Sequence, residues 1–460
     1  MTWFGRWAKR TALACLAATP AWGAAHADVL TVDRAAELAL KHNLDVINAQ
    51  AGVNDGRGAL YSSYAGVLPN FGATYGRSKQ RFENSSGFRA FGGANVPATF
   101  DLQTLTTRST EVSVDWNILD LSRLSAMRSS QSGMRSAKER LEAARNDVVL
   151  TAKRQFFEVV KQIRLADVAD RTVRLSRDNE RRVRALFEVG SVSKSDLLKA
   201  QVRTSQSELD SIVAHTNVTI SRVNLASLIG LQEPQMGDVD TVLAVSPRHY
   251  DPDSVLVEAG KNRPDIMAAR SELAAARSQL TSSYLTYVPA LVGRGTWDLD
   301  PKTENETKGY LDTTYPTGPR KVDINSENTV HREWAGSVTV GLQIGFLNPS
   351  FTQTARARVL RAEEGLAAAQ RNLVGEVKQA LLVYTQAIEG EKVAQRALES
   401  AREDLKLSQE KYNVGSATIL DLLDSQVALS RAASDLVTAL AVIHQSEAQV
   451  DRVRGVYPKP

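Results

Sequence analysis

Two very long stretches without proline constrain the fold of this chain more than any other feature. They cover residues 122–187 and 351–412. A helix of roughly 65 residues would be roughly 100 Å long, at a rise of 1.5 Å per residue. One globular core cannot cover a helix of that length, so the sequence predicts helices that pack laterally on neighbours as coiled coils.

The last helix shows a repeat that suits lateral packing. Large apolar residues recur every seven positions, and mostly small residues lie three positions after each of them. The two sets are Leu422, Leu429, Leu436, Ile443 and Val450, and Ser425, Ala432, Ala439, Ser446 and Val453. Small side chains let helix backbones approach on more than one flank, as a closed ring of helices requires, although a simple two-helix hairpin would also carry such a seam.

The chain repeats itself. Residues 187–202 align without a gap with residues 412–427, and eight of the sixteen positions are identical. A second pair of matches, Leu60 to Pro69 and Leu280 to Pro289, lies in the same order in each half. We therefore predict a duplicated unit with a first repeat over 28–250 and a second over 251–460. Each repeat is expected to run helix, two strands, long helix, turn and helix.

Alternation of apolar with polar or small residues predicts the strands. Val112, Val114 and Trp116 alternate with polar residues, and Val338 to Phe346 repeat the pattern in the second half. The strands are expected near residues 70–119 and 290–347, with long loops over about 83–105 and 300–332. The first helix of each half is expected over 32–67 and 254–288, ended by a proline shortly after.

The N-terminus has the pattern of an export signal. Three basic residues precede an apolar run, and Ala25-His26-Ala27 fits a cleavage site, so residues 1–27 are predicted to be a signal peptide. Cys15 follows the charged start too soon to favour a lipid anchor. The signal carries three of the positive charges in a net charge of +4, which leaves the mature chain near +1. That charge argues against nucleic acid as a partner.

Membrane crossing is expected to use strands. The sequence contains no apolar run of 18 or more residues after the signal, so no transmembrane helix is expected. Barrel strands alternate and escape such a scan. Four strands per chain cannot close a barrel, and open strand edges cannot face lipid. Several chains would have to pool their strands.

The duplicated order, the proline-ended first helices and the paired Val-Gly-Ser turns resemble the TolC family of outer-membrane factors. The resemblance covers nearly all of the chain after residue 27. It implies a mainly α fold with membrane β structure, in which a homotrimer forms a barrel of four strands per chain, continuous with a long α-helical barrel in the periplasm. It also implies an outer-membrane exit duct for a tripartite efflux pump or a type I secretion system. The implied partners are a periplasmic adaptor protein, an inner-membrane transporter and outer-membrane lipid.

The two Val-Gly-Ser segments are expected to turn one helix into the next, since glycine tolerates the positive φ that ends a helix. This structural role alone would explain them. The resemblance adds that these turns are the periplasmic tips where adaptors bind, with Gly190, Ser191, Gly415 and Ser416 as contacts.

Asp421 and Asp424 are the candidate gate residues. At a spacing of three they share one helix face. Taken alone, such a pair indicates only a helix face that is exposed to solvent. The resemblance places the family's two aspartate rings at these positions, where carboxylates from three chains would attract cations. In the first repeat, Asp196 corresponds to Asp421 but Lys199 stands opposite Asp424.

The family also closes its entrance with polar links between the two hairpins. By resemblance, Tyr412 is the tyrosine of such a link and Asp196 is its acidic partner. Ala417 stands where the family's arginine would be, so that second link is absent.

Two other classes of protein, an enzyme and a surface adhesin, are alternatives to this interpretation. The motifs of serine hydrolases, zinc proteases and phosphate-binding loops are missing, and the six histidines have no metal-like spacing. The sequence therefore predicts no enzyme, no cofactor and no metal site, and a passive duct. A surface coiled-coil adhesin anchored in the outer membrane would also combine long helices with alternating strands. Adhesins place one anchor at one end, whereas here strands recur in both halves.

Overall fold

The computed structural model describes residues 29–91, 94–244, 247–299, 302–311, 320–324, 329–330, 334–342 and 347–456. The predicted signal peptide and Cys15 lie outside these residues. The elements in chain order are α1 (Val32–His42), α2 (Leu44–Ala65), β1 (Asn70–Phe91), β2 (Ala94–Leu119), α3 (Leu121–Glu188), α4 (Lys194–Ile229), the 3₁₀ helix η1 (Glu233–Gln235), α5 (Pro252–Asn262), α6 (Pro264–Leu285), β3 (Ala290–Asp298), β4 (Lys302–Leu311), β5 (Arg320–Ile324), β6 (Thr329–Val330), β7 (Trp334–Gly341), α7 (Leu347–Asn413) and α8 (Ile419–Arg454).

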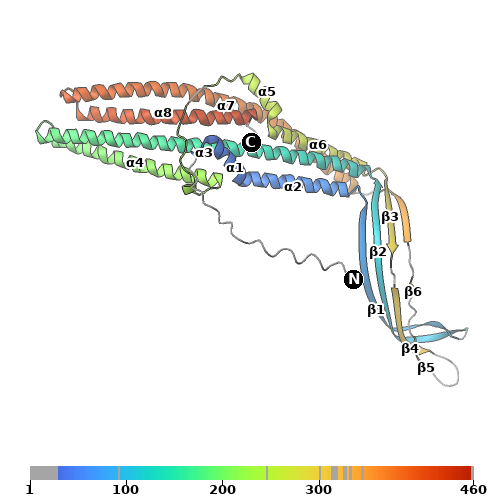
Figure 1. Cartoon of the computed structure of the whole chain (residues 1–460). Coiled ribbons are helices and arrows are strands. Elements are labelled where there is room, and N and C mark those ends of the chain that lie inside the picture. The colour runs from blue at the N-terminus through green and yellow to red at the C-terminus, as the bar shows by residue number, and fades with distance from the viewer. Residues whose placement is uncertain are drawn as a thin grey trace, which may run out of the picture.

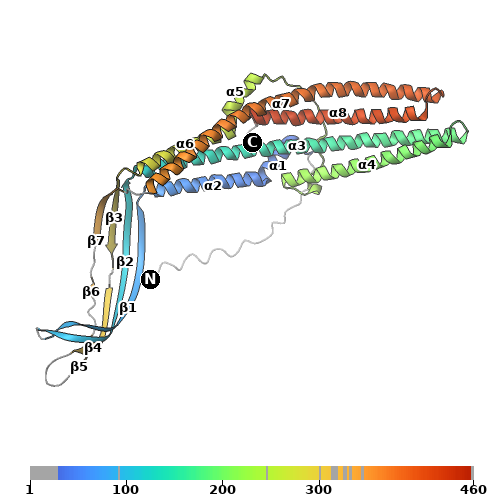
Figure 2. The same ribbon diagram turned by 180° about the vertical axis from the view of Figure 1, so that it is seen from behind.

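The chain is a long bundle of helices with a sheet at one end (Figure 1). Two helices, α3 with 68 residues and α7 with 67, run the whole length of the bundle, roughly 100 Å. At the far end they turn back into α4 and α8, and the reverse view shows the same two hairpins side by side (Figure 2). The predicted class, mainly α with β strands at one end, is confirmed. The boundary between repeats at residues 250 and 251 stays a prediction.

The first helix of each half is broken, where the sequence predicted one continuous helix. Between α1 and α2, Asn43 adopts an extended conformation, and its side chain accepts a hydrogen bond from the Asp45 amide at 2.8 Å. Between α5 and α6, Arg263 is extended because the following Pro264 disfavours the helical conformation of the residue before it. These breaks let α1 and α5 leave the bundle axis and pack against α3 and α7.

The sheet has four antiparallel paths, β1, β2, β3 continued by β4, and β5 to β7. β3 and β4 pair with successive stretches of β2: Asp298 of β3 lies opposite Glu111, and Lys302 of β4 lies opposite Arg108. The prediction of a long loop over 83–105 was wrong, because β1 continues to Phe91 and β2 starts at Ala94. Ladder hydrogen bonds extend these strands although their polar composition is typical of loops. Part of the loop expected over 300–332 is also strand, in β4, β5 and β6.

The two faces of the sheet differ sharply in chemistry. Residues directly opposite each other on paired strands share a face. The register therefore defines an apolar face and a polar face near the helices. The apolar face carries Phe71, Tyr75, Val112, Val114, Trp116, Leu291, Trp297, Trp334, Val338 and Val340. The polar face carries Gly72, Thr74, Gly76, Ser109, Glu111, Ser113, Asp115, Arg294 and Thr296.

Both outer edges of the sheet lack a neighbour among the described residues. β1 pairs only with β2, and β7 pairs only with β3. Exposed strand edges carry unsatisfied backbone groups and are templates for pairing with another chain. A single chain therefore cannot present this sheet to lipid.

Three apolar clusters hold the helices together. The first joins α1 and α4 to α3 around Phe156 and Val159, and the second joins α5 to α7 and α8 around Val377 and Val450. The third, here the tip cluster, joins the two hairpins at the far end. It contains Val183, Ala200, Leu405, Ile419, Leu422 and Leu423.

The heptad positions of α8 mostly point inward. Leu422, Ile443 and Val450 are buried, as are the small residues Ser425, Ala432 and Ser446. By length and composition alone, α8 could cross a membrane, with a mean hydropathy of 1.3 in its best window. In the structure α8 instead packs along α7 and α3.

Candidate functional site

The two hairpin turns lie at the end of the bundle farthest from the sheet (Figure 1). Gly190 has φ +80° and Gly415 has φ +75°, a conformation that side chains other than glycine rarely adopt. In each turn the next amide closes the helix: Ser191 donates to the Leu186 carbonyl at 2.8 Å, and Ser416 donates to the Lys411 carbonyl at 2.9 Å.

Nothing lies within 4 Å of a Cβ built on either glycine. The positive φ therefore explains these glycines, and crowding does not. The two glycines and the serines after them are exposed. The predicted contact residues are thus accessible at the tips, and their role as contacts stays a prediction.

Capping boxes start both helices that follow the turns. Ser193 Oγ accepts from the Asp196 amide at 3.1 Å, and Thr418 Oγ1 accepts from the Asp421 amide at 3.3 Å. In return, Asp421 Oδ2 accepts from the Thr418 hydroxyl at 2.7 Å and from the Thr418 amide at 2.9 Å. The same capping box therefore forms in both repeats.

Asp421 and Asp424 lie on the exposed side of α8. Both are exposed, whereas Leu422 and Leu423 between them are buried in the tip cluster. The hydrogen bonds from Thr418 hold the pKa of the Asp421 carboxyl below its usual range. The first turn of α8 thus presents two carboxylates to solvent, one of them tied to the helix cap.

Tyr412 and Asp196 lie near each other across the two hairpins, but no hydrogen bond joins them in the structure. The Tyr412 Oη is buried and has no partner among the described residues. Burial raises the pKa of the Tyr412 hydroxyl, and the negative charge of Asp196 raises it further. The Asp196 carboxylate accepts from the Ser193 hydroxyl at 2.8 Å instead.

Two buried amides close to the tips were not anticipated from the sequence. Asn179 on α3 is 5% exposed and Gln426 on α8 is 2% exposed. Neither side-chain oxygen has a donor among the described residues. A buried acceptor without a partner costs roughly 1–3 kcal/mol. The position of Gln426 next to the buried small residue Ser425 was the signal that could have indicated its burial.

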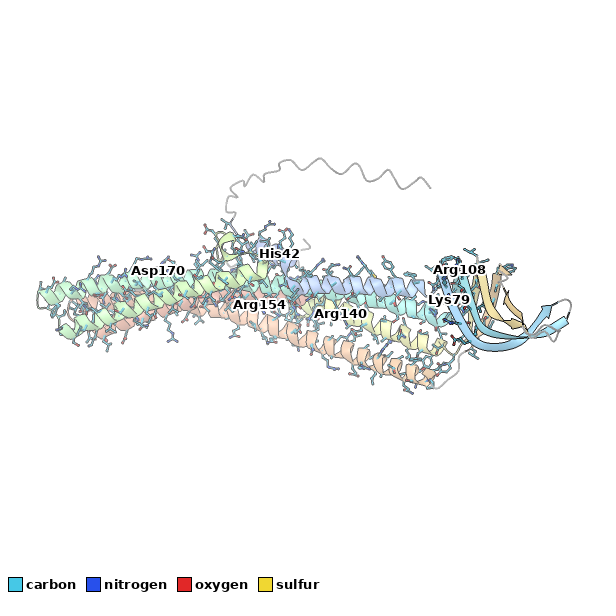
Figure 3. All side chains as sticks on the ribbon, turned by 90° about the horizontal axis from the view of Figure 1, so that it is seen from below. His42, Lys79, Arg108, Arg140, Arg154 and Asp170 are labelled. Atoms are coloured by element: carbon cyan, nitrogen blue, oxygen red, sulfur yellow. The ribbon has the colours of Figure 1, made fainter. Side chains whose placement is uncertain are left out.

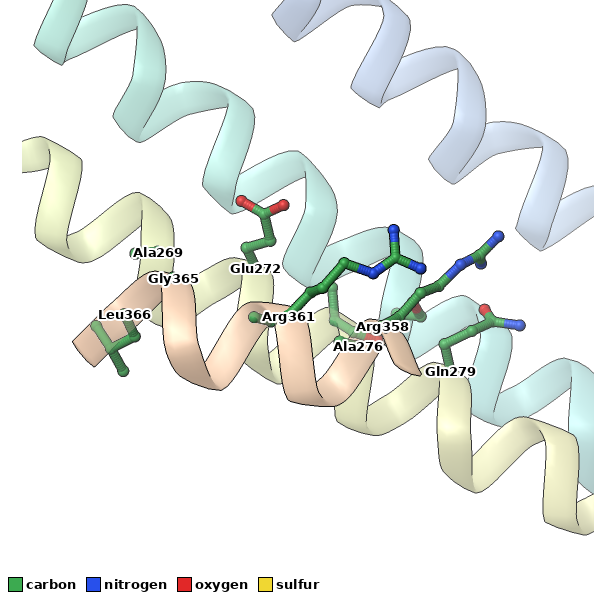
Figure 4. A pocket seen from close by; sticks show the side chains of 11 residues that line it. Ala269, Glu272, Ala276, Gln279, Arg358, Arg361, Gly365 and Leu366 are labelled. Atoms are coloured by element: carbon green, nitrogen blue, oxygen red, sulfur yellow. Dashed lines mark hydrogen bonds between the residues drawn. The ribbon is translucent and has the colours of Figure 1, made fainter. Parts of the chain in front are cut away.

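A groove between α6 and α7, seen from close by in Figure 4, lies in the half of the bundle that is nearer the sheet. Its volume is about 420 Å³, and small residues such as Ala269, Ala276 and Gly365 line it. Arg358 and Arg361 project from α7 over it. The groove shares no residue with the hairpin tips, so the predicted gate and this groove are separate features.

The described part of the chain holds no cluster of three or more histidine, cysteine or acidic residues that could bind a metal. The carboxylates of Asp421 and Asp424 both come from α8 and are exposed to solvent. The tip of each chain thus presents two exposed carboxylates and two exposed turns.

The chain matches the family described as outer membrane efflux protein over residues 35–231 and again over residues 255–456. It is 23% identical to the outer membrane protein TolC of Vibrio cholerae over 383 residues, which cover 83% of this chain and 80% of that protein. It is 24% identical to the nodulation protein T of Rhizobium leguminosarum bv. trifolii over 419 residues, 88% of this chain and 81% of that one. The fold is similar to that of the CmeC outer membrane channel of Campylobacter jejuni, with a TM-score of 0.72, 17% identity and coverage of 92% of this chain and 85% of that one.

Proposed function

Because the chain belongs to the outer membrane efflux protein family, we propose that three copies form a passive exit duct through the outer membrane. One observation supports this most directly. Each chain ends its bundle of roughly 100 Å in a four-path sheet whose two outer edges have no partner within the described ranges. Pairing the β1 edge of one chain with the β7 edge of the next would satisfy every edge, and three chains would give a closed barrel.

The protein is located in the outer membrane, with its helical part in the periplasm. In this orientation the sheet lies in the lipid and the hairpin tips point toward the inner membrane. The family match favours this duct over the surface adhesin that the sequence left open, because an adhesin would place its helices outside the cell.

The proposed partners meet the tips. Exposed turns at Gly190 and Gly415 suit contact with a periplasmic adaptor, which would link the duct to an inner-membrane transporter. The transporter would supply the energy, since the duct is passive. We propose small molecules or an unfolded secreted protein as cargo, delivered by a tripartite efflux pump or a type I secretion system.

Three copies of the Asp421 and Asp424 pair would surround the proposed entrance with two rings of carboxylates. Both side chains already face solvent, so assembly could turn them toward a shared axis without repacking the tip cluster. Rings of acidic side chains select cations.

Conductance in planar bilayers tests the duct itself. We expect the purified full-length protein, shown by mass to be a trimer, to form stable channels without any added energy source. A folded trimer that forms no channels would sink the proposal, and protease cleavage of the helices on intact cells would turn the interpretation back to an adhesin.

The proposed latch predicts the effect of a double variant. We expect Tyr412→Phe combined with Asp196→Ala to increase resting conductance by roughly several-fold, because it removes both groups of the proposed link, which would form when the assembled entrance closes. Ser193 retains the capping role of its hydroxyl, and Asp196→Asn alone serves as the control that keeps an acceptor at this position. Resting conductance that is the same in the double variant and the wild type would rule out the latch.

The free Tyr412 hydroxyl gives this test a second readout. Since the buried Oη has no hydrogen-bond partner among the residues that the structure describes, Tyr412→Phe by itself should not lower the free energy of unfolding by more than about 1 kcal/mol. A conductance change without a stability loss would then point to gating rather than to misfolding.

A further inference from the structure

We propose that α2 of one chain packs directly against α7 of the next copy, along a seam that repeats the α3–α6 seam inside each chain. This inference rests on the proposed three-chain duct and names the surfaces through which its copies meet. In the half of the bundle nearer the sheet, α2 packs on α3, α3 on α6 and α6 on α7. Figure 3 shows α2 in blue and α7 in orange at the two margins of this layer.

The seam between α3 and α6 shows how the two repeats of one chain meet. Ser125 donates to the Ser278 carbonyl at 2.8 Å, and Ser129 donates to the Ala275 carbonyl at 2.9 Å. A bond from a short side chain of one helix to the backbone of the other requires the two backbones to lie close together. Small residues at the contact permit this, because the side chains there set the distance between packed helices.

The duplication assigns the counterpart of this seam on α2. Helices α2 and α6 both have 22 residues, and the matching segments at 60–64 and 280–284 align them without a gap. Gly58 therefore corresponds to Ser278, and Asp55 corresponds to Ala275. The flank of α6 that meets α3 thus has a counterpart on α2 made mostly of small residues.

The start of α7 supplies the other side of the seam. Leu119-Asp120 before α3 matches Leu347-Asn348 at the start of α7, so Gln353 corresponds to Ser125, and Ala357 corresponds to Ser129. The two flanks of one chain's layer, α2 and α7, would then meet in the next copy as α6 and α3 meet within the chain.

The assigned flank of α2 is exposed in the chain. Gly56 faces α3, since a Cβ built on it would lie 3.4 Å from the Met134 Cα. Gly58 is two residues farther on, about 200° round the helix, and so lies on the side away from α3. The exposed residues of this flank are Ala51, Asp55, Gly58, Ser62 and Ala65.

The assigned flank of α7 is exposed as well. Ala355 is buried, and Ala357, two residues farther on, lies on the opposite side of the helix. This flank also carries Leu360, a large apolar side chain that is 62% exposed. Its exposed residues are Ser350, Gln353, Ala357 and Leu360.

Gly58 is the position that points most directly to a neighbouring backbone. Glycine in the interior of a helix destabilises that helix relative to alanine. Gly58 is not among the glycines with positive φ, and a Cβ built on it would meet nothing within 4 Å. Neither its backbone conformation nor crowding by the described residues requires glycine here. A second helix that passes as close as α3 passes Ser278 would require it.

The strands continue the same seam. Helix α2 leads into β1 and α7 follows β7, and these are the two outer strands of the sheet. Pairing β1 of one chain with β7 of the next, as the proposed barrel requires, therefore brings α2 beside α7. By the correspondence of the repeats, Gly58 would lie opposite Gln353, Asp55 opposite Ala357, and the small Ala51 beside the exposed Leu360 of the neighbour.

Cysteine cross-linking in the full-length trimer tests this seam. Cys15 lies in the predicted signal peptide, so the mature chain is expected to hold no other thiol. We expect oxidation of Gly58→Cys combined with Gln353→Cys to join most chains into covalent dimers and trimers, because a disulfide requires Cα atoms within about 7 Å of each other. Arg57→Cys with Gln353→Cys is the matched control. Arg57 is also exposed but points about 100° away from Gly58, so cross-linking should be about tenfold lower.

The seam inside the chain provides the positive control. Ser125→Cys with Ser278→Cys should cross-link as readily, but every chain should keep the mass of a monomer. Cross-links confined to single chains in the Gly58→Cys and Gln353→Cys variant would overturn the proposal. Equal amounts of covalent dimer and trimer in that variant and in the Arg57→Cys control would overturn it too.

A second variant tests the close approach without cysteine. Gly58→Leu should lower the fraction of trimer in detergent by about tenfold or more, because the larger side chain overpacks the seam. Gly365→Leu is its control, since Gly365 lies in the groove between α6 and α7 and also has nothing within 4 Å of a built Cβ. An undiminished trimer fraction in Gly58→Leu would contradict the seam. Folded wild type that is only monomeric would contradict the proposed duct, whereas a stable trimer without the Gly58–Gln353 cross-link would contradict only this seam.

Discussion

Replacing Asp421 and Asp424 by asparagine is expected to abolish the cation preference of the channel. With two carboxylates from each of three chains, the proposed entrance carries a dense negative charge, and asparagine removes that charge at nearly the same volume. The ratio of cation to anion permeability, measured from reversal potentials in asymmetric salt, should fall from several-fold to about unity. Total conductance should change less than this ratio, because the pore dimensions are retained.

The first repeat provides the control for this experiment. Asp196 occupies the same capping position as Asp421 and forms the same box with the residue three positions before it. Asp196→Asn therefore removes a capping carboxylate near the tip without touching α8. Should Asp196→Asn reduce the cation preference as strongly as the α8 variant does, the selectivity would not reside in Asp421 and Asp424.

The pH dependence of the channel should report on the proposed role of Asp421. The pKa of Asp421 is held down mainly by hydrogen bonds from Thr418. Its carboxylate therefore stays charged as the pH falls through the usual aspartate range, and the stability that this interaction contributes is lost only when the pH falls through the lowered pKa. In Asp424→Asn, the remaining cation preference should persist as the pH falls through the usual aspartate range, and in Asp424→Asn combined with Thr418→Val it should be lost at a higher pH.

The largest loss of stability is expected from Phe156→Ala. This side chain is 3% exposed and lies in the cluster where α1 and α4 pack on α3. Removing a buried phenyl ring forfeits its burial and leaves a cavity, which costs roughly 3–5 kcal/mol. The midpoint of urea unfolding, followed by helical circular dichroism, should fall accordingly.

The adjacent residue tests whether that loss depends on burial. Phe157 is only partly buried and stacks on His444 with ring centroids 4.7 Å apart. Phe157→Ala should therefore cost clearly less than Phe156→Ala, and Phe156→Leu should recover most of the loss. A larger cost at Phe157 would mean that the α3 and α8 contact, and not the α1 cluster, dominates the stability of the bundle.

Local signals in the sequence predicted most of the helical architecture. The long helices expected over 122–187 and 351–412 agree with α3 and α7 to within a few residues, because continuous helix formers without proline leave no alternative. The turns at Gly190 and Gly415 and the caps at Ser193 and Thr418 were also readable, since positive φ and capping depend on residues that are neighbours in the chain.

Structural features that depend on residues distant in the chain could not be predicted from the sequence. The polar strand residues beyond Glu83 were predicted to form a loop from their composition. They are strands because they pair with neighbouring strands. The helix breaks at Asn43 and Arg263 have local causes, the capping side chain of Asn43 and the proline after Arg263. The prediction of continuous helices had followed the apolar pattern and overlooked both.

The sequence by itself determined two repeated helix–strand–helix units, their turns, their capped helices and the acidic pair on α8, because each is set by residues within a turn or two of one another. Only the tertiary structure decided that Asn179 and Gln426 are buried, that the described part of the chain offers the Tyr412 hydroxyl no hydrogen-bond partner, and that Arg77 lies opposite Arg108 on the sheet. Those features depend on the register between helices and between strands, and register is fixed by packing and ladder pairing across the whole chain.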